Sequence, residues 1–280
     1  MKEINVQDVI PVVERLCIES CTLLGEDWWQ AIDQAIAREE STIGRDILSQ
    51  LKENARLAAT TSSAICQDTG IAVIFVELGQ DVRLTGGNLY DAINEGVRRG
   101  YTKGYLRKSV LNDPLIRKNT GDNTPAIIHT HIVNGDFLKI TVAPKGAGSE
   151  NVSGVKMLKP SEGVEGIKRY VLQMVEEAGG NTCPPTLVGV GIGGDLEEVA
   201  LLAKKALLRP LLQRHPLPHI AQLEEELLTM INKTGIGPQA LGGRITALDV
   251  HIEVYPTHIA CLPVAVNFQC HAVRHAEAVL

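Results

Sequence analysis

The 280-residue sequence is poor in aromatic residues, at 4%, and it has no long uninterrupted apolar segment. No apolar run approaches the roughly 18 residues that a membrane span requires, so we expect no membrane-spanning helix. The first eight residues include acids where a secretory or transit peptide has basic or continuous apolar residues. We therefore expect a cytoplasmic protein, and the 44% hydrophobic content is typical of a globular chain.

The sequence also lacks an excess of positive charge. It contains 27 Lys and Arg residues against 33 Asp and Glu residues, which gives a formal net charge of -6. No cluster of basic residues interleaved with aromatic residues is present, so general nucleic-acid binding is not expected. An anionic substrate would have to be bound by a few locally placed cations.

None of the six cysteines forms a Cys-x-x-Cys pair, which argues against zinc ribbons and ferredoxin-type clusters. Disulfides are not expected in a chain without a secretory leader. Cys17 and Cys21 lie four residues apart on an apolar helical face, which predicts core packing. Cys261 has apolar neighbours and is also predicted to lie in the core. The other three cysteines lie before apolar strands or among hydrogen-bonding residues: Cys66, Cys183 and Cys270.

Hydrophobic periodicity predicts an α+β fold. Residues 6–60 show the spacing of amphipathic helices, and residues 71–76 form an apolar run typical of a buried strand. We expect a single domain over residues 1–280. In it, residues 1–60 form a helical N-terminal segment, and residues 61–280 form a core with a mixed, partly antiparallel sheet packed with helices.

Two local patterns give more specific predictions for the sheet. Strands predicted at residues 126–133 and 137–143 are separated by Asn-Gly-Asp, a strong hairpin signal, so the two strands are expected to pair directly. Residues 245–255 alternate between apolar residues on one face and polar residues such as Asp249 and His251 on the other. This strand is predicted to be half exposed or covered by a partner.

Residues 62–70 read Ser-Ser-Ala-Ile-Cys-Gln-Asp-Thr-Gly and end directly before a predicted strand. Burying such polar side chains unpaired costs a few kcal/mol each, which favours a functional site. For this stretch alone, a polar turn in which Asp68 and Thr69 cap local backbone groups is the simpler interpretation. Residues 145–151 form a second small-residue loop, whose amides could either surround an oxygen anion or belong to a flexible turn.

Gly189, Gly191 and Gly194 match the Gly-x-Gly-x-x-Gly pattern between a predicted strand and a predicted helix. A nicotinamide-dependent dehydrogenase is one hypothesis, although no second strand ending in Asp or Glu follows. The glycines could instead hold a carboxylate or allow a helix to pack closely on a strand. His129 and His131 share one face of a predicted strand, but without a third ligand a polar or interface-facing surface is favoured over a metal site.

Four motifs together resemble those of iron–sulfur hydro-lyases in their order and spacing. The motifs are Cys66-Gln67-Asp68-Thr69-Gly70, the loop at residues 145–151, Cys183-Pro184-Pro185 and Gln269-Cys270-His271-Ala272. The chain resembles the α subunits of two-subunit class I fumarate hydratases and L-tartrate dehydratases. The resemblance extends from the N-terminal helices nearly to Leu280.

This resemblance implies a 4Fe-4S cluster with only three protein ligands, at Cys66, Cys183 and Cys270. The remaining iron stays open and can act as a Lewis acid on a leaving hydroxyl, whereas electron-transfer clusters normally have four ligands. The resemblance also implies that Asp68 exchanges a proton with that hydroxyl. The positions that correspond to substrate-binding residues are Gln67, Arg107, Gly148 and His258.

In single-chain members of the family, a second domain supplies a Thr base and the Arg and Lys residues that clamp the substrate. Because this chain ends at Leu280, the resemblance implies a separate β subunit, in a heterodimer or an α2β2 assembly. The expected reaction is the hydration of fumarate to L-malate, and the second candidate is the dehydration of L-tartrate to oxaloacetate. A non-catalytic cluster-bearing subunit is a further alternative, which three cysteine ligands beside a carboxylate make less favourable.

Overall fold

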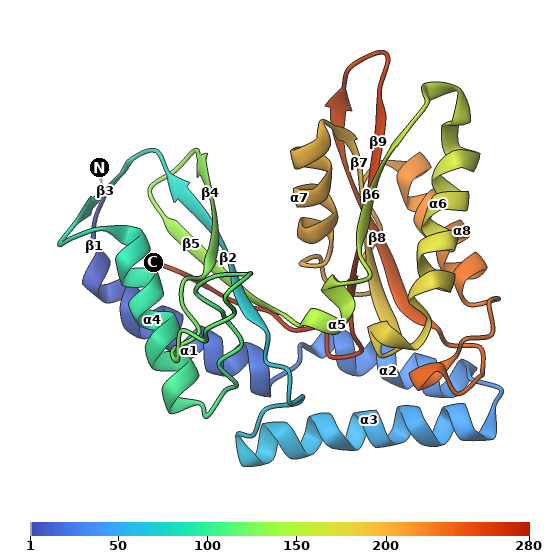
Figure 1. The fold of residues 1–280 in the computed structure, drawn as a ribbon, viewed down its shortest axis with the longest axis horizontal. Helices are drawn as coiled ribbons and strands as arrows, with labels where there is room; N and C mark the ends of the chain where they lie inside the picture. Colours follow the sequence, from blue (N-terminus) through green and yellow to red (C-terminus); the bar gives the residue numbers. More distant parts are fainter. Residues whose placement is uncertain (1) are drawn as a thin grey trace. The chain divides into compact units, whose positions relative to one another are not determined.

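The computed structural model describes residues 2–280, which form two compact units (Figure 1). The helices and mixed sheets of the two units confirm the predicted α+β class. The single domain predicted from the sequence stays a prediction. The first unit consists of Met1–Leu24, Asn54–Gly146 and Arg274–Leu280, and the second of Gly25–Glu53 and Ala147–Val273.

A four-stranded mixed sheet forms the centre of the first unit. Its strands lie in the order β10 (Ala276–Val279), β5 (Leu138–Lys145), β2 (Ile71–Gly79) and β4 (Ile127–Val133). β2 is antiparallel to β5 and parallel to β4, so it separates the two strands predicted to form a hairpin. That hairpin prediction is wrong. The apolar run of β2 is buried on both faces, and a central position gives it a hydrogen-bonded neighbour on each edge.

Helices α1 (Val9–Thr22) and α4 (Leu89–Lys103) pack together in the core of this unit. Small residues on α4 allow the close approach, since a Cβ atom added to Gly100 would lie 2.7 Å from Cys17 Cβ. Cys17 and Cys21 are fully buried, which confirms their predicted core role. Burial raises the pKa of the Cys21 thiol to about 11. β1 (Lys2–Asn5) and β3 (Val82–Thr85) form a separate parallel pair that the sequence did not predict.

The second unit contains another four-stranded mixed sheet, in the order β6 (Gly154–Leu158), β9 (Leu262–Gln269), β7 (Thr186–Gly194) and β8 (Ala247–Thr257). β7 is parallel to β8 and antiparallel to β9. Figure 1 shows α7 on one face of this sheet and α6 and α8 on the other. These helices span Leu196–Ala206, Gly163–Ala178 and Pro218–Ile231, respectively.

The remaining elements are short or connect the larger ones. α2 (Glu26–Arg38) belongs to the second unit, and the residues of α3 (Thr42–Thr61) are divided between the units. α5 (Ala147–Glu150) is a single helical turn. The 3-10 helices span Val6–Asp8, Pro160–Glu162, Gly179–Thr182 and Pro238–Ala240. No helix within residues 2–280 has both the length and the apolar character needed to cross a membrane.

The glycine motif has a packing role in this fold. Gly189 and Gly191 lie inside β7, and α7 begins only after Asp195, whose side chain accepts the Glu198 N–H bond. A Cβ atom at Gly189 would lie 2.2 Å from the Ala203 carbonyl oxygen, which belongs to α7. One at Gly191 would come equally close to the backbone of that helix. The glycines therefore allow α7 to pack directly on β7, as one of the two alternative interpretations predicted.

The first part of the polar face of β8 is buried, contrary to the half-exposed strand that the alternation predicted, and Glu253 on that face is partly exposed. Asp249 and His251 are fully buried. Asp249 forms an ion pair of 2.5 Å with Arg214, and His251 lies within hydrogen-bonding distance of Asp249 and of the Ala206 carbonyl oxygen. Burial raises the pKa of Asp249, but its hydrogen bond with His251 and the charge of Arg214 outweigh burial, so the pKa lies below its usual value. Residues of this chain, Arg214 and Ala206, contact these two side chains, so no partner is needed to cover them.

Candidate active site

The polar segment before β2 is fixed by side chains that bind its main-chain carbonyl groups. The fully buried Tyr101 hydroxyl donates to the carbonyl oxygens of Thr69 at 2.9 Å and Gly70 at 3.2 Å. The buried Asn123 amide also donates to Gly70 at 3.2 Å, and its oxygen accepts the Ser109 N–H bond. The segment leaves the regular hydrogen-bonding pattern of the sheet but keeps its carbonyl groups satisfied.

Arg274 binds the same segment from the C-terminal part of the first unit. It is 3% exposed, and its guanidinium donates to the Asp68 carbonyl oxygen at 2.9 Å. The Asp68 carboxylate accepts the Gly70 N–H bond at 3.1 Å. Main-chain and side-chain atoms of Asp68 are therefore both held by hydrogen bonds.

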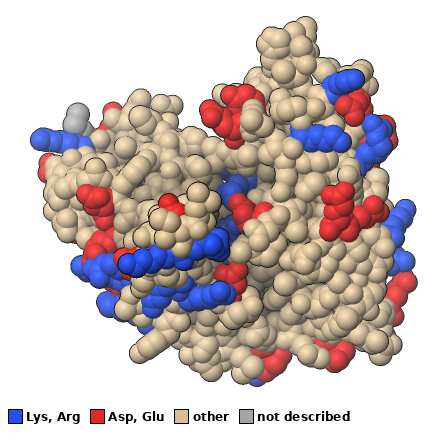
Figure 2. All heavy atoms as spheres, viewed as in Figure 1, with Lys and Arg blue, Asp and Glu red and all other residues tan. Residues whose placement is uncertain are grey.

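The structure brings four predicted site residues into one part of the first unit. Cys66 is half-buried, and its thiol donates to the Gln67 side-chain oxygen at 3.2 Å. Asp68 follows directly, and the Thr69 hydroxyl donates to the Arg107 carbonyl oxygen at 3.3 Å. The Arg107 side chain is exposed. Figure 2 shows Lys and Arg side chains gathered on part of the first unit, with Asp and Glu side chains among them.

Cys183 and Cys270 lie at one end of the sheet in the second unit. Cys183 precedes β7 and is exposed, whereas Cys270 follows β9 and is half-buried. The two segments touch, because the His271 N–H group donates to the Cys183 carbonyl oxygen at 3.3 Å. The Trp28 indole donates to the His271 carbonyl oxygen at 2.6 Å and anchors the second segment.

Gly148 belongs to the same end of the second unit. It lies in α5, and a Cβ atom added to it would come within 3.0 Å of the Asn181 carbonyl oxygen, just before Cys183. The second unit thus brings together Gly148, Cys183 and Cys270. Only a small residue at position 148 allows α5 to lie this close to the Asn181 carbonyl oxygen without displacing the backbone.

His258 lies at the opposite end of that sheet, in the connection between β8 and β9. β7 has nine residues, and its far end pairs with the last residue of β8, so the two ends are about 26 Å apart. Within one copy of the chain, His258 is too distant to share a small ligand with Cys183. Cys261 lies in the same connection and is half-buried, so its predicted core position is wrong. The apolar neighbours Ile259 and Ala260 are themselves exposed.

The remaining histidine prediction concerns β4. The His129 ring stacks on Phe75, with ring centroids 5.3 Å apart. Across residues 2–280, no group of three or more His, Cys, Asp and Glu side chains is arranged to hold a metal ion. Cys66 belongs to the first unit, whereas Cys183 and Cys270 belong to the second.

The sequence did not point to the residues that fix the Asp68 segment. Tyr101 lies four residues after Val97 and eight after Ile93, a spacing that continues the buried face of α4. That spacing could have identified Tyr101 as a core residue. Asn123 and Arg274 carry no comparable local signal, because their partners lie 53 and 206 residues away.

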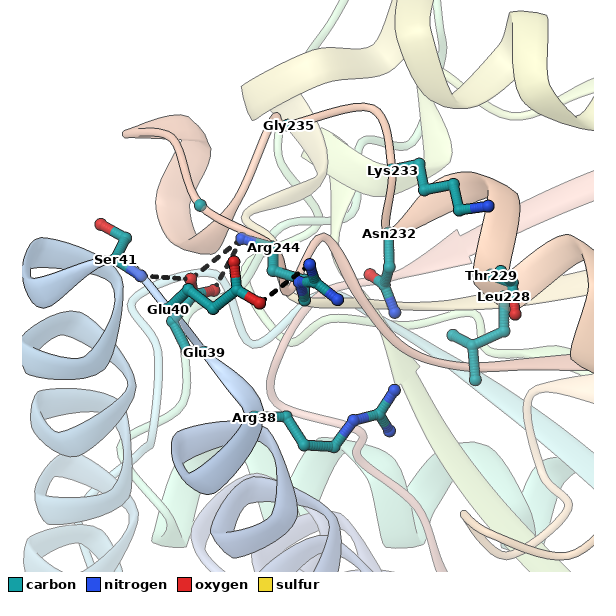
Figure 3. Close-up of a pocket in the computed structure, with 11 residues that line it drawn as sticks. Arg38, Glu39, Glu40, Ser41, Leu228, Thr229, Asn232, Lys233, Gly235 and Arg244 are labelled. Atoms are coloured by element: carbon teal, nitrogen blue, oxygen red, sulfur yellow. Dashed lines mark hydrogen bonds and ion pairs between the residues drawn. The ribbon is translucent and has the colours of Figure 1, made fainter.

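A hollow of about 460 Å³ in the second unit contains none of the predicted site residues (Figure 3). It is lined mainly by polar and charged residues from the end of α2, the connection between α2 and α3, the end of α8 and the segment before β8. The buried Glu39 carboxylate accepts N–H bonds from Ser41, Arg244 and Ile245 at 2.8–2.9 Å. The neighbouring Glu40 carboxylate pairs with the Arg244 guanidinium at 2.8 Å. Glu39 therefore ties the connection between α2 and α3 to the segment before β8.

The chain matches the Fumarate hydratase (Fumerase) family over residues 10–279. This match covers nearly the whole chain, and the chain therefore belongs to this family of hydro-lyases. The resemblance inferred from the four motifs is thereby confirmed.

Individual relatives carry a related name. The chain is 42% identical over 273 residues to "Putative L(+)-tartrate dehydratase subunit alpha" of Methanocaldococcus jannaschii, with 95% of each chain covered. It is 34% identical over 281 residues to "L(+)-tartrate dehydratase subunit alpha" of Escherichia coli, with 98% of this chain and 92% of the relative covered. A protein of the same name from Shigella boydii shows the same identity and coverage.

The cysteine side chains fit the iron–sulfur cofactor on which this family depends. Thiolates are the ligands that iron–sulfur clusters require. Cys66, Cys183 and Cys270 are all solvent-accessible to some degree and form no disulfide, whereas Cys17 and Cys21 are sealed in the core. The chemistry of each of these three thiols is therefore compatible with binding iron.

Replacing Tyr101 with Phe is expected to lower the free energy of unfolding by about 1–3 kcal/mol, because the Thr69 carbonyl group loses its buried hydrogen-bond donor. Tyr105→Phe is the matched control, since Tyr105 is 95% exposed, and its effect should stay within about 0.5 kcal/mol. Denaturant unfolding of both variants provides the measurement. Equal stabilities would show that the Tyr101 hydroxyl does not hold the segment.

Glu39→Gln is expected to lower the free energy of unfolding at pH 7 by about 1–3 kcal/mol, because an acceptor is replaced by an amide donor. Burial raises the pKa of Glu39, but the backbone N–H donors outweigh it, and the pKa lies below its usual value of 4.5. The stabilisation by the ionised group is therefore complete above the unfolded-state pKa and is lost as the pH falls through the lower folded-state pKa.

The difference in the free energy of unfolding between wild type and Glu39→Gln should consequently shrink as the pH falls below 4.5. Denaturant unfolding between pH 7 and pH 3 measures this difference. Glu40→Gln is the control, because the Glu40 side chain is 72% exposed and its surface ion pair contributes about 1 kcal/mol at most. A Glu39→Gln effect that is small at pH 7 and grows toward acid pH would contradict this role.

Proposed function

We propose that this chain is the catalytic α subunit of an iron–sulfur hydro-lyase that reversibly hydrates fumarate to L-malate. The observation that carries the proposal is the Cys66-Gln67-Asp68 segment. Buried donors fix the carbonyl groups of Asp68 and Thr69 at the end of this segment. The Thr69 hydroxyl also donates to the main-chain carbonyl oxygen of Arg107, whose side chain is exposed. A rigid backbone that presents reactive groups is what an active site requires.

Cys66, Cys183 and Cys270 would hold the 4Fe-4S cluster, with one iron left open. When bound, this cofactor supplies a Lewis acid for the hydroxyl that leaves L-malate or adds to fumarate. Three thiolates, in place of the four of an electron-transfer cluster, make this open position possible.

The other predicted residues bind the dicarboxylate and move a proton. Asp68 gives a proton to the departing hydroxyl, which leaves as water, and takes one from water in the hydration direction. Arg107 binds a substrate carboxylate through its planar guanidinium. Gln67 and the Gly148 backbone N–H group complete the hydrogen bonds to the substrate.

His258 is also proposed to bind substrate, and the sheet geometry limits how it does so. In one copy of the chain it lies about 26 Å from the end of the sheet at which Cys183 is found. A contact between His258 and a substrate bound near Cys183 therefore requires a second copy of the chain in the assembly. An α2β2 enzyme contains such a copy.

The carbon-bound proton requires a base that we assign to a β subunit. The relatives named as α subunits are covered almost over their whole length, which supports a comparable division of the enzyme. The working enzyme is thus a cytoplasmic heterodimer or α2β2 assembly in which β carries the base and further cations.

L-tartrate is the second candidate substrate, because the relatives at 34–42% identity carry that name. Its dehydration to oxaloacetate breaks the same kinds of bond, a C–O bond beside a C–H bond next to a carboxylate. Fumarate hydration and tartrate dehydration therefore need the same Lewis acid and the same proton exchange from the α chain. They differ in the contacts to one extra hydroxyl group.

Cluster binding is tested by the iron and sulfide content of anaerobically purified protein. Wild type should hold about four irons per chain and give a three-iron EPR signal after mild oxidation. Cys66→Ala, Cys183→Ala and Cys270→Ala should each lose the cluster, and Cys261→Ala should retain it because Cys261 lies at the other end of the sheet. The assigned ligands would be refuted if only Cys261→Ala lost the cluster, or if wild type purified with β contained no iron.

Substrate and partner are tested by steady-state rates of the α chain with and without its β subunit. With β, we expect kcat/KM for L-malate to exceed that for L-tartrate at least tenfold, and Asp68→Asn to lower kcat about 100-fold or more. The α chain alone should be inactive because it lacks the base. Substantial turnover by α alone would overturn the role of β, and the reverse substrate preference would assign the enzyme to L-tartrate.

A further inference from the structure

Arg274 is a buried cation beside the reactive segment, and the family motifs did not single it out. Only 3% of its surface is exposed. It lies just before β10, and the donor–acceptor pair that it forms with the Asp68 carbonyl oxygen spans 206 residues of sequence. Burying a guanidinium is unfavourable unless nearby acceptors and negative charge compensate for the lost water.

The Asp68 carboxylate lies near this cation, as the surroundings of Gly146 show. A Cβ atom added to Gly146 would lie 3.2 Å from the Asp68 carboxylate oxygen Oδ2 and 3.6 Å from the Arg274 nitrogen Nη2. Both charged groups therefore border the same small space, which the missing side chain of Gly146 leaves open. Arg274 remains protonated at any pH at which the protein is folded, so its charge is permanent.

Two atoms of Asp68 thus have defined neighbours. Its carbonyl oxygen is bound by Arg274 at 2.9 Å, and its carboxylate oxygen Oδ1 caps the Gly70 N–H group at 3.1 Å. A fixed main chain and a fixed Oδ1 restrict how the carboxylate can rotate. Oδ2 is the remaining oxygen, and it is the one on the side of Gly146 and Arg274.

We infer that Arg274 is a positioning residue, which holds Asp68 in the orientation needed for proton exchange with the substrate hydroxyl. This inference rests on the proposed function, because Asp68 is the proton-exchanging group there. The guanidinium is suited to the task because its planar fork can bind a carbonyl group and remain beside a carboxylate at the same time. A Lys ammonium at this position would keep the charge without the fork.

The first test separates positioning from general stability by hydrogen exchange on the chain purified anaerobically. In Arg274→Lys, the Gly70 amide should exchange about tenfold faster, because Asp68 no longer holds its cap, while the Ile74 amide inside β2 should keep its wild-type rate. Arg38→Lys is the control, since Arg38 is exposed and lies in the second unit. An unchanged Gly70 rate in Arg274→Lys would overturn the inference.

Gly146→Ala provides a second variant that retains both charged side chains. The added methyl group would press on Asp68 and separate it from Arg274, so the Gly70 amide should again exchange faster. Because this variant keeps Arg274 itself, it remains informative if Arg274→Lys fails to fold. Wild-type exchange in Gly146→Ala would count against the inference.

The second test uses turnover of L-malate by the complete enzyme with β. Arg274→Lys should lower kcat about 10- to 100-fold and change KM less than about threefold. In an Asp68→Asn background, the same replacement should have little further effect, because two residues that act through one group are not additive. Additive losses would mean that Arg274 acts independently of Asp68, which would overturn the inference.

The two tests also separate this inference from the proposed function. An inactive wild-type enzyme with full cluster content would refute the proposed function. Hydrogen exchange at Gly70 would still decide whether Arg274 holds Asp68, since it requires no turnover.

Discussion

The site of this protein depends on hydrogen bonds to the main-chain carbonyl groups of one irregular segment. Residues 66–70 enter β2 without a neighbouring strand to satisfy them, and an unsatisfied buried carbonyl group is costly. Tyr101, Asn123 and Arg274 donate to this segment from a helix, a loop and the C-terminal part of the unit. These donors bind the carbonyl groups of Asp68, Thr69 and Gly70, and so fix the main chain that carries the Asp68 side chain.

The second unit shows a different constraint, which is the close packing of a helix on a strand. Gly189 and Gly191 bring α7 against β7, because any side chain there would collide with the helix backbone. The pattern imitates a dinucleotide fingerprint, yet the glycines face a helix instead of a phosphate. The same sheet places Cys183 and Cys270 together at one end and His258 at the other. Sheet direction therefore decides which motif residues can act together in one copy of the chain.

Errors in the sequence-based interpretation have a common origin in partners that are distant along the chain. An Asn-Gly turn predicted a hairpin between β4 and β5, but β2 takes the position between them because its apolar run is buried on both faces. Alternation in β8 predicted an exposed polar face, but Arg214 compensates the buried Asp249. In each case the local pattern was correct, and a segment elsewhere in the sequence determined what covered it.

The sequence by itself determined the α+β class, the helical N-terminal segment and the family, because periodicity and motif order are properties of neighbouring residues. The resemblance of its motifs to those of the family also pointed to Cys66, Cys183 and Cys270 as candidate ligands. Tertiary structure alone decided the strand order, the burial of Asp249 and the part that Arg274 plays behind Asp68. The physical reason is that a hydrogen bond or an ion pair depends on distance in space, and the pairs that fix this site join residues as many as 206 positions apart.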